Sequence, residues 1–322
     1  MKRIGILTSG GDTPGMNAAI KAVAAAAKYR GMTVMGIHKG YAGLLEGRIS
    51  ELRNEDLDGI IAKGGTILKT ARCAEMRTKE GQEKAVKVLN AFGIEGLVVI
   101  GGDGSFMGAK ILSHMGIAAI GLPGTIDNDL AYTDYTIGFD TAVNCVINEI
   151  SRIRDTMISH ERIGVVEVMG NKCGDIALYS GIASDAEFIL LPELEFDVDE
   201  ICEKLITSRI KGKMTSIIVI AEGAGKGEAL ANYIKAKTNL DVKAIVLGHV
   251  QRGGNASAFD ILLSTKLGNR AVELLTEGIT GRVVGIKNNK IVDYDIDEAL
   301  ATKMKFEEKL YNMHEEMMAH WF

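Results

Sequence analysis

The sequence predicts an α/β protein whose mostly parallel sheets are covered by helices on both faces. Short β-branched segments alternate with longer helical patterns along almost the whole chain, as in successive βαβ units. Segments such as LVVIGG and SIIVIAEG are apolar at consecutive positions, which is typical of parallel strands buried on both faces. The 322 residues correspond to about two domains, at roughly 150 residues each.

The elements follow in order from these patterns. The β-branched and apolar segments predict strands at Arg3–Thr8, Thr33–His38, Gly96–Ile100, Ala118–Leu122, Ile163–Val168, Glu187–Leu191, Ser216–Ala221, Lys243–Leu247 and Arg282–Ile286. The amphipathic segments between them predict helices at Pro14–Arg30, Glu80–Phe92, Ser105–Met115, Thr141–Ser159, Asp197–Lys211, Gly227–Thr238, Phe259–Glu277 and Lys305–His320. The segment EGAGKG, residues 222–227, lacks the GxxxxGK[ST] spacing and is predicted to be mostly turn.

Composition excludes several classes of function. The 37 basic residues against 42 acidic ones give a formal charge of −5, which disfavours a general nucleic-acid binder. Aromatic residues make up 5%, too few for a platform that stacks single-stranded bases. No apolar run approaches about 18 residues, so we expect no membrane span. Small phosphorylated ligands remain open, because they need only a local cluster of cations.

The cysteines and the N-terminus predict a cytoplasmic location. Cys73, Cys145, Cys173 and Cys202 are scattered and form no CxxC motif, which indicates reduced thiols in a reducing compartment. The segment MKRIGILTSGGD has too little apolar length for a signal peptide.

Two glycine-rich turns follow predicted strands, and each opens a predicted helix. The first is TSGGDTPGMNAAI, in which we expect Asp12 or Thr13 to cap the helix and Pro14 to occupy its first turn. The second is VVIGGDGS, which contains Asp103. Helix starts present free N–H groups to anions, and glycine lets a phosphate approach closely. A plain strand–helix turn, with Asp103 as its N-cap, is the alternative; two such turns favour nucleotide phosphates, with Mg²⁺ bridging Asp103 and the phosphates.

Two further loops carry candidate chemistry. LPGTIDND places Thr125, Asp127 and Asp129 after an apolar strand, and in an extended chain these alternate residues point to a common side. One carboxylate there can accept a proton from a sugar hydroxyl during phosphoryl transfer, and the other can face a metal; an Asp-rich surface turn is the alternative. LGHVQRGG places His249 and Arg252 among glycines, which favours a phosphate site over a structural histidine.

In order and spacing, the segments TSGGDTPGMNAAI, GGTIL…AR, VVIGGDGS, GLPGTIDND, TIGFDTA, VVEVMGN, CGD and LGHVQRGG resemble the bacterial 6-phosphofructokinase family. The resemblance extends from Arg3 to about Tyr311 and implies two Rossmann-like three-layer domains with the active site in the cleft between them. Residues 1–138 plus about 256–304 would form the larger, ATP-binding domain. Residues 139–255 plus about 305–322 would form the smaller, fructose-6-phosphate-binding domain.

The activity that the resemblance implies is Mg²⁺-dependent transfer of a phosphoryl group from ATP to the 1-hydroxyl of fructose 6-phosphate. A homotetramer with shared active and effector sites is also implied. The implied catalytic residues are Asp127 as the general base, with Arg72, Thr125, Asp129 and Gly11. The implied ATP contacts are Gly11, Arg72, Cys73, Gly102, Asp103, Gly104 and Ser105, with Asp103 as the Mg²⁺ ligand. The implied sugar-phosphate contacts are Thr125, Asp127, Met169, Gly170, Asn171, Glu222, His249 and Arg252, joined by Arg162 and Lys243 from the neighbouring chain. The implied effector residues are Lys21, Arg154, Asp185, Glu187, Lys211 and Lys213.

The chain departs from the family pattern at several of these positions. Asn171 and Lys243 stand where the family usually has arginine, and Cys73 stands where it often has an aromatic residue. Lysine keeps the charge of arginine but loses its planar fork of donors, which predicts a looser grip on the 6-phosphate. In the effector site Ala25 and Asn54 replace cations and Asp185 replaces glycine. We therefore expect a weak or altered response to ADP or phosphoenolpyruvate.

Three alternatives compete with the ATP-dependent kinase. Pyrophosphate-dependent relatives carry Asp in place of Gly104 and Lys in place of Gly124, so the two glycines favour ATP. A regulatory paralogue without catalysis is supported only by Asn171 and Lys243. An NAD-dependent oxidoreductase would need GxGxxG after a strand, which the first glycine turn lacks.

Overall fold

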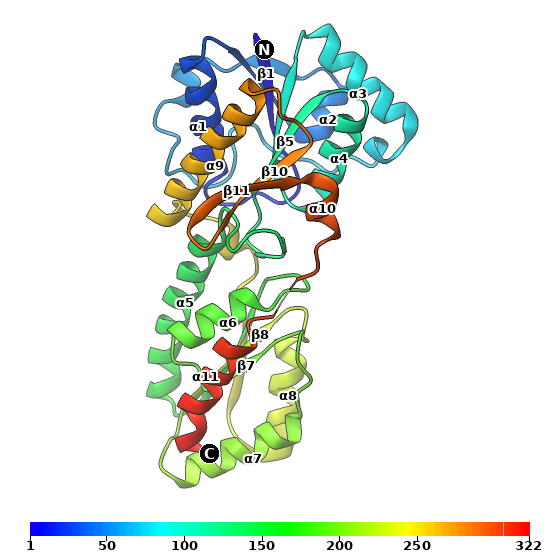
Figure 1. The fold of residues 1–322 in the computed structure, drawn as a ribbon. Coiled ribbons are helices and arrows are strands. Elements are labelled where there is room, and N and C mark those ends of the chain that lie inside the picture. The colour runs from blue at the N-terminus through cyan, green and yellow to red at the C-terminus, as the bar shows by residue number, and fades with distance from the viewer. Residues whose placement is uncertain (305) are drawn as a thin grey trace. The chain divides into compact units, whose positions relative to one another are not determined.

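The computed structural model describes residues 1–304 and 306–322, which form two compact units (Figure 1). Unit 1 comprises Met1–Ile126, Leu130–Thr141 and Arg252–Met304. Unit 2 comprises Asp127–Asp129, Ala142–Gln251 and residues 306–322. Each unit contains one sheet, and parallel pairs predominate in both, so the α/β prediction is confirmed.

Unit 1 is built on a seven-stranded sheet in the order β11-β10-β5-β4-β1-β2-β3. Its strands are β1 (Arg3–Thr8), β2 (Thr33–Ile37), β3 (Ile49–Glu51), β4 (Gly96–Gly101), β5 (Ala118–Pro123), β10 (Arg282–Lys287) and β11 (Lys290–Asp295). The edge strands β3 and β11 pair antiparallel with their neighbours. These two were not predicted, because β3 has three residues and β11 is only partly buried and carries three charged residues.

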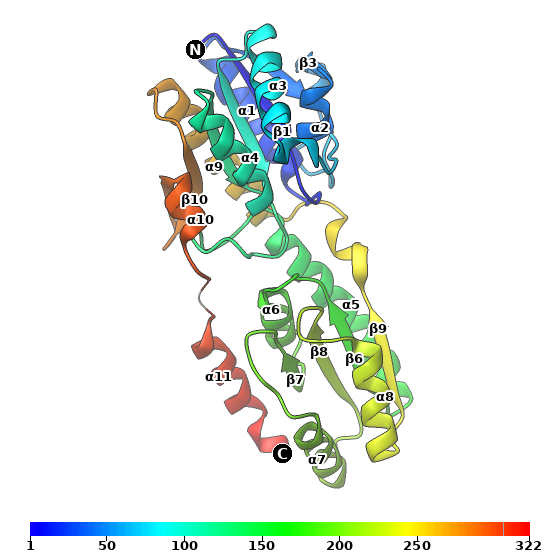
Figure 2. The ribbon, with the colours of Figure 1, turned by 90° about the vertical axis from the view of Figure 1, so that its right-hand side faces the viewer.

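Helices cover both faces of this sheet, as Figure 2 shows from the side. The helices of unit 1 are α1 (Met16–Tyr29), α2 (Gly40–Leu45), α3 (Lys79–Ala91), α4 (Asp103–His114), α9 (Ala258–Thr276) and α10 (Ile296–Ala301). Ile4 and Ile6 of β1 pack with α1 and α9 in one apolar cluster. Leu7 faces the opposite cluster with α2, α3, α4 and α10. Alternate residues of one strand thus enter both cores, which is why these strands are apolar throughout.

Unit 2 has a four-stranded parallel sheet in the order β7-β8-β6-β9. Its strands are β6 (Ile163–Val168), β7 (Phe188–Leu190), β8 (Ser216–Ala221) and β9 (Val242–Val246). Its helices are α5 (Phe139–Ser159, which begins in unit 1), α6 (Asp175–Ala183), α7 (Val198–Ile210), α8 (Gly227–Thr238) and α11 (Glu308–Met318). Helix α6 was not predicted, because it is buried on several sides and shows no polar face.

The start of α1 corrects one prediction. The helix begins at Met16, and its N-cap is Gly15 with φ of 101°, without a side-chain cap. Neither Asp12 nor Thr13 caps it. The Thr13 hydroxyl is buried and donates instead to the Ile137 carbonyl at 3.0 Å. Among the described residues, no helix is both long and apolar enough to cross a membrane.

A buried carboxylate organises the start of α5. Asp260 is fully buried and accepts hydrogen bonds from the Gly138 amide (2.9 Å), the Thr141 amide (2.8 Å) and the Thr141 hydroxyl (2.6 Å). These bonds satisfy N–H groups at the helix N-terminus that have no partner within the helix. Burial nevertheless raises the pKa of Asp260 to about 6, because the charged form is desolvated.

The substitution Asp260→Asn tests the raised pKa of Asp260, because it removes the titrating group and with it the pH dependence that this group gives to stability. The folded protein binds the Asp260 proton more tightly than the unfolded chain, so wild-type stability falls as pH rises from about 4 to 6. A difference of one between the pKa values of the folded and unfolded protein changes the free energy of unfolding by about 1.4 kcal/mol. The urea midpoint of the wild type, measured relative to Asp260→Asn, should therefore be higher at pH 4.5 than at pH 6.5. A difference that is constant with pH would contradict the raised pKa.

Candidate active site

The two glycine turns meet at the carboxyl edge of the unit 1 sheet. β1 and β4 are adjacent parallel strands, and the Ser9 amide donates to the Ile100 carbonyl at 3.0 Å. A Cβ on Gly101 would lie 2.3 Å from the Ser105 Oγ, so no side chain fits there. Gly10 has φ of 87°, and a Cβ on it would lie 3.5 Å from the same hydroxyl. The paired turns therefore expose backbone in the way that phosphate sites require.

Helix α4 begins within the second turn. Its N-cap is Gly102, so Asp103 is the first helical residue and the N-cap alternative is wrong. Both Asp103 and Gly104 are exposed, and a Cβ on Gly104 would meet no atom within 4 Å. Thr125 Cβ lies 3.8 Å from the position of a Cβ on Gly102. The helix N-terminus thus borders open space that favours an anion.

The turn fits a Mg²⁺ ion that is complexed with phosphate. The described residues hold no group of three or more His, Cys, Asp or Glu side chains arranged for a metal. Mg²⁺ is commonly held by one or two carboxylates, water and substrate phosphates, rather than by a full protein cage. Asp103 is an exposed carboxylate beside a candidate phosphate site, which suits that mode of binding.

Arg252 lies against the first glycine turn. Its Nη1 is 2.3 Å from the position that a Cβ on Gly11 would occupy, and it donates to the Asp12 carbonyl at 3.2 Å. Arg72 is exposed. Cys73 is half-buried and packs against the apolar cluster that contains Leu7, which directs at least part of it toward the core.

In unit 2, several predicted residues meet at the carboxyl ends of β6, β8 and β9. The Asn171 amide donates to the Glu222 carboxylate at 3.0 Å, with Asn171 in the left-handed region at φ of 55°. The Met169 amide donates to the Gln251 side chain at 3.1 Å. Gln251 belongs to the short 3-10 helix Gly248–Arg252, which also carries the exposed His249. Residues 222–224 form a turn, as predicted.

The segment Asp127–Asp129 is not extended. Asn128 has φ of 54°, so side-chain alternation does not apply there, and the argument for a common side fails at this residue. The Asn128 side chain donates to the Asp175 carboxylate at 2.8 Å. Burial raises the pKa of Asp129, while hydrogen bonds from its own backbone and from the Asn171 side chain oppose the rise. Burial also raises the pKa of Asp175 to about 6.

Arg162 and Lys243 share one carboxylate. The Arg162 Nε lies 2.5 Å from one oxygen of Asp241, and the Lys243 Nζ lies 3.1 Å from the other. Hydrogen bonds from these two cations lower the pKa of Asp241. The structure thus brings together two predicted 6-phosphate ligands from different elements.

The predicted effector residues of unit 2 form a second ionic cluster. Buried Glu187 lies 2.8 Å from Lys213 and 3.7 Å from Arg154, and Arg154 also donates to the Asp185 carbonyl at 2.8 Å. Lys211 donates to the main-chain oxygen of Phe322 at 2.5 Å. The Lys213 ammonium also lies 4.1 Å from the centre of the Trp321 ring, a cation–π contact.

In unit 1, Lys21 lies on α1, and Ala25 follows it on the same helix. Asn54, which stands where the family usually has a cation, accepts a hydrogen bond from Lys28 at 2.8 Å. A lysine therefore stands beside the position at which the family usually has arginine.

Four residues that had no predicted role lie among the candidates in the structure: Asn128, Asp175, Asp241 and Gln251. Asn128 and Gln251 lie inside the quoted segments LPGTIDND and LGHVQRGG, so their position was the available signal. Asp175 lies in the quoted segment CGD, apart from the segment that contains its partner, and Asp241 lies in none of the quoted segments. Their roles become visible only when the fold brings the partners together.

Known phosphofructokinases match this chain over most of its length. Residues 3–275 match the family model described as Phosphofructokinase. The chain is 55% identical over 313 residues to "ATP-dependent 6-phosphofructokinase" of Clostridium botulinum, covering 97% of this chain and 98% of that protein. The enzyme of the same name from Clostridium novyi has the same identity and coverage.

Solved structures share the fold. Phosphofructokinase from Saccharomyces cerevisiae superposes with a TM-score of 0.90 at 35% identity, over 100% of this chain and 48% of that one. This chain therefore spans about half the length of the yeast chain. A pyrophosphate-dependent phosphofructokinase from Marinobacter aquaeolei superposes with a TM-score of 0.86 over 95% of this chain and 86% of that one, at 23% identity, which shows the fold alone.

Proposed function

Because the chain belongs to the phosphofructokinase family, we propose that it transfers the γ-phosphoryl group of ATP to the 1-hydroxyl of fructose 6-phosphate. The observation that carries this proposal is the 55% identity over almost the full length of proteins named as ATP-dependent enzymes. The pyrophosphate-dependent structure is much more distant, at 23% identity.

The donor is held by unit 1. Backbone N–H groups of the two glycine turns and of the α4 N-terminus bind the phosphates. Asp103 would hold a Mg²⁺ ion complexed with them. The ion would supply charge neutralisation between the phosphate oxygens. Arg72, which is exposed, contributes a cation to the transferring group, where negative charge develops in the transition state.

The acceptor is held by unit 2, through the cluster at the carboxyl ends of β6, β8 and β9. The cations Arg162 and Lys243 of a neighbouring subunit complete its phosphate site. The 1-hydroxyl oxygen attacks the γ-phosphorus, the bond from that phosphorus to the bridging oxygen of ADP breaks, and the hydroxyl proton passes to the Asp127 carboxylate. The products are ADP and fructose 1,6-bisphosphate. Asp129 accepts a hydrogen bond from the Asn171 side chain, and it orients the loop that carries Asp127.

His249 and Arg252 donate to the 6-phosphate in this proposal, and the enzyme works in the cytoplasm as a homotetramer. The position of Arg252 supports its role, because its guanidinium lies against Gly11 of the first glycine turn.

A coupled assay for fructose 1,6-bisphosphate tests the proposal, with fructose 6-phosphate and Mg²⁺ and with either ATP or pyrophosphate as donor. We expect turnover with ATP, and at least about 100-fold lower kcat/KM with pyrophosphate, equivalent to about 2.7 kcal/mol of transition-state binding. Turnover with pyrophosphate alone would reject ATP as the donor. Folded protein that is inactive with both donors would favour a regulatory paralogue.

A further inference from the structure

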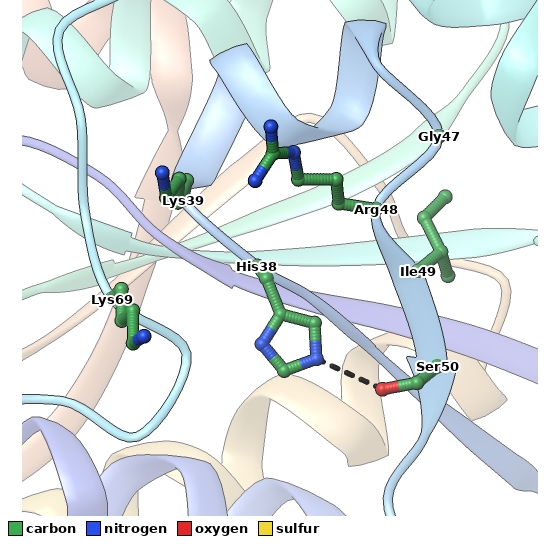
Figure 3. A pocket seen from close by; sticks show the side chains of 7 residues that line it. All are labelled: His38, Lys39, Gly47, Arg48, Ile49, Ser50 and Lys69. Atoms are coloured by element: carbon green, nitrogen blue, oxygen red, sulfur yellow. Dashed lines mark hydrogen bonds between the residues drawn. The ribbon is translucent and has the colours of Figure 1, made fainter.

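A basic cavity lies at the carboxyl end of β2 in unit 1, formed by residues to which no role has been assigned so far (Figure 3). Its volume is about 410 Å³. It is lined by His38 and Lys39, which follow β2, by residues 47–50 around the start of β3, and by Lys69. The carboxyl edge of a parallel sheet is where α/β proteins bind ligands.

Positive charge accumulates in this basic cavity. Lys39, Arg48 and Lys69 are basic side chains in its lining, and His38 adds a polar imidazole ring. Arg48 forms an ion pair with Glu46, but both side chains are 52% exposed, and such a pair contributes little. Across the described residues, Lys39 and Lys69 form no ion pair with a carboxylate within 4 Å. The whole chain carries −5, so this excess of cations is local and favours a bound anion.

The backbone holds both lysines at unusual positions. Lys39 and Lys69 each have φ of 60°, a left-handed conformation that costs a residue other than glycine free energy. Hydrogen bonds fix both sites: the Lys39 amide donates to the Leu68 carbonyl at 2.7 Å, and the Thr8 hydroxyl donates to the Lys69 carbonyl at 3.0 Å. The two ammonium groups therefore extend from fixed backbone at the wall of the cavity.

The lining also indicates the kind of anion. The His38 Nε2 and the Ser50 Oγ are 2.8 Å apart, and Figure 3 shows this pair together with the Arg48 side chain, which extends toward Lys39. These groups add polar partners to the cations. Ile49 is apolar, and among the described residues no Phe, Tyr or Trp side chain lines the cavity. The two lining groups that can stack on a base are already engaged, because His38 is hydrogen-bonded to Ser50 and Arg48 is ion-paired with Glu46, which disfavours an aromatic base. Several cations around a small volume suit several phosphate oxygens.

We propose that this basic cavity binds a compact multivalent phosphate anion that carries no aromatic base. The site is separate from the glycine turns, although it is connected to them. Thr8, the last residue of β1, bonds to Lys69, and the Thr70 hydroxyl donates to the Gly10 carbonyl at 2.7 Å. An anion held by Lys69 can therefore influence the first glycine turn through one short loop.

Inorganic tripolyphosphate is the probe that tests this proposal. It is titrated calorimetrically into the full chain while a non-hydrolysable ATP analogue saturates the nucleotide site. The test variant is the double substitution Lys39→Asn and Lys69→Asn, because asparagine tolerates the left-handed conformation while removing the charge. The control is the double substitution Lys79→Asn and Lys290→Asn, which removes the same charge from α3 and β11 without touching the cavity.

We expect the wild type and the control to bind one tripolyphosphate per chain, and the test variant to bind it at least about 10-fold more weakly. Equal affinity in the test variant and the control would overturn the proposal, as would no binding to the wild type. Tripolyphosphate that only displaces the ATP analogue would assign the anion to the glycine turns and also overturn it. If citrate bound as tightly as tripolyphosphate, the cavity would not be specific for phosphate, and this outcome would overturn the assignment of a phosphate ligand. None of these outcomes depends on turnover, so the proposed kinase activity can fail without affecting this test.

Discussion

Asp127→Ser is expected to lower kcat by about 10²–10⁴-fold, the usual contribution of a positioned general base. Serine cannot hold the proton that leaves the sugar hydroxyl, but it preserves a small polar side chain in the loop. The KM values for ATP and fructose 6-phosphate should change much less than kcat, because the carboxylate acts mainly in the transition state. The measurement is steady-state kinetics in the coupled assay, with both substrates varied.

Asp155→Ser is the matched control, because Asp155 is an exposed residue within α5 and has no assigned role. It should retain activity within about twofold, as most surface substitutions have small effects. A variant at Asp127 that lost substrate binding and kept kcat would assign the carboxylate to binding rather than to proton transfer.

Much of the fold could be predicted because strands buried on both faces are apolar throughout and each is followed by an amphipathic helix. β1, β6 and β8 lie at the predicted residues. What could not be predicted lacks such a signal. α6 is buried on several sides, so it has no polar face, and β3 is a three-residue edge strand.

Of the candidate site, too, one part could be predicted from the sequence and another part could not. A motif that lies within one segment, such as VVIGGDGS, could be interpreted directly from local rules about glycine and helix starts. The pairing of Arg162 and Lys243 through Asp241 joins residues that are about 80 positions apart, and only the pairing of β6 with β9 explains it. The left-handed Asn128 also could not be foreseen, and it changes the geometry of the loop that carries Asp127.

Gly104→Asp is expected to lower kcat/KM for ATP by about 10²–10³-fold without destabilising the fold. A Cβ at this position meets no protein atom within 4 Å, so packing does not require the glycine. An added carboxylate would face the nucleotide phosphates in the proposed site, and two like charges about 4 Å apart repel by roughly 4 kcal/mol at an effective dielectric of 20. In the first turn of α4, the same charge interacts favourably with the helix dipole, so the thermal unfolding midpoint should not fall.

Gly104→Asn separates charge from size, because asparagine matches aspartate in shape and is neutral. It should retain most of the activity with ATP. Equal losses in the two variants would show that bulk rather than charge matters.

Gly124, unlike Gly104, has no room for a side chain. A Cβ there would lie 2.9 Å from Ile100 and 3.3 Å from the Gly101 amide nitrogen, so Gly124→Lys should lower the thermal unfolding midpoint. Of the two glycines that distinguish ATP from pyrophosphate in the family pattern, one leaves space for a ligand and the other is required by the packing of the sheet.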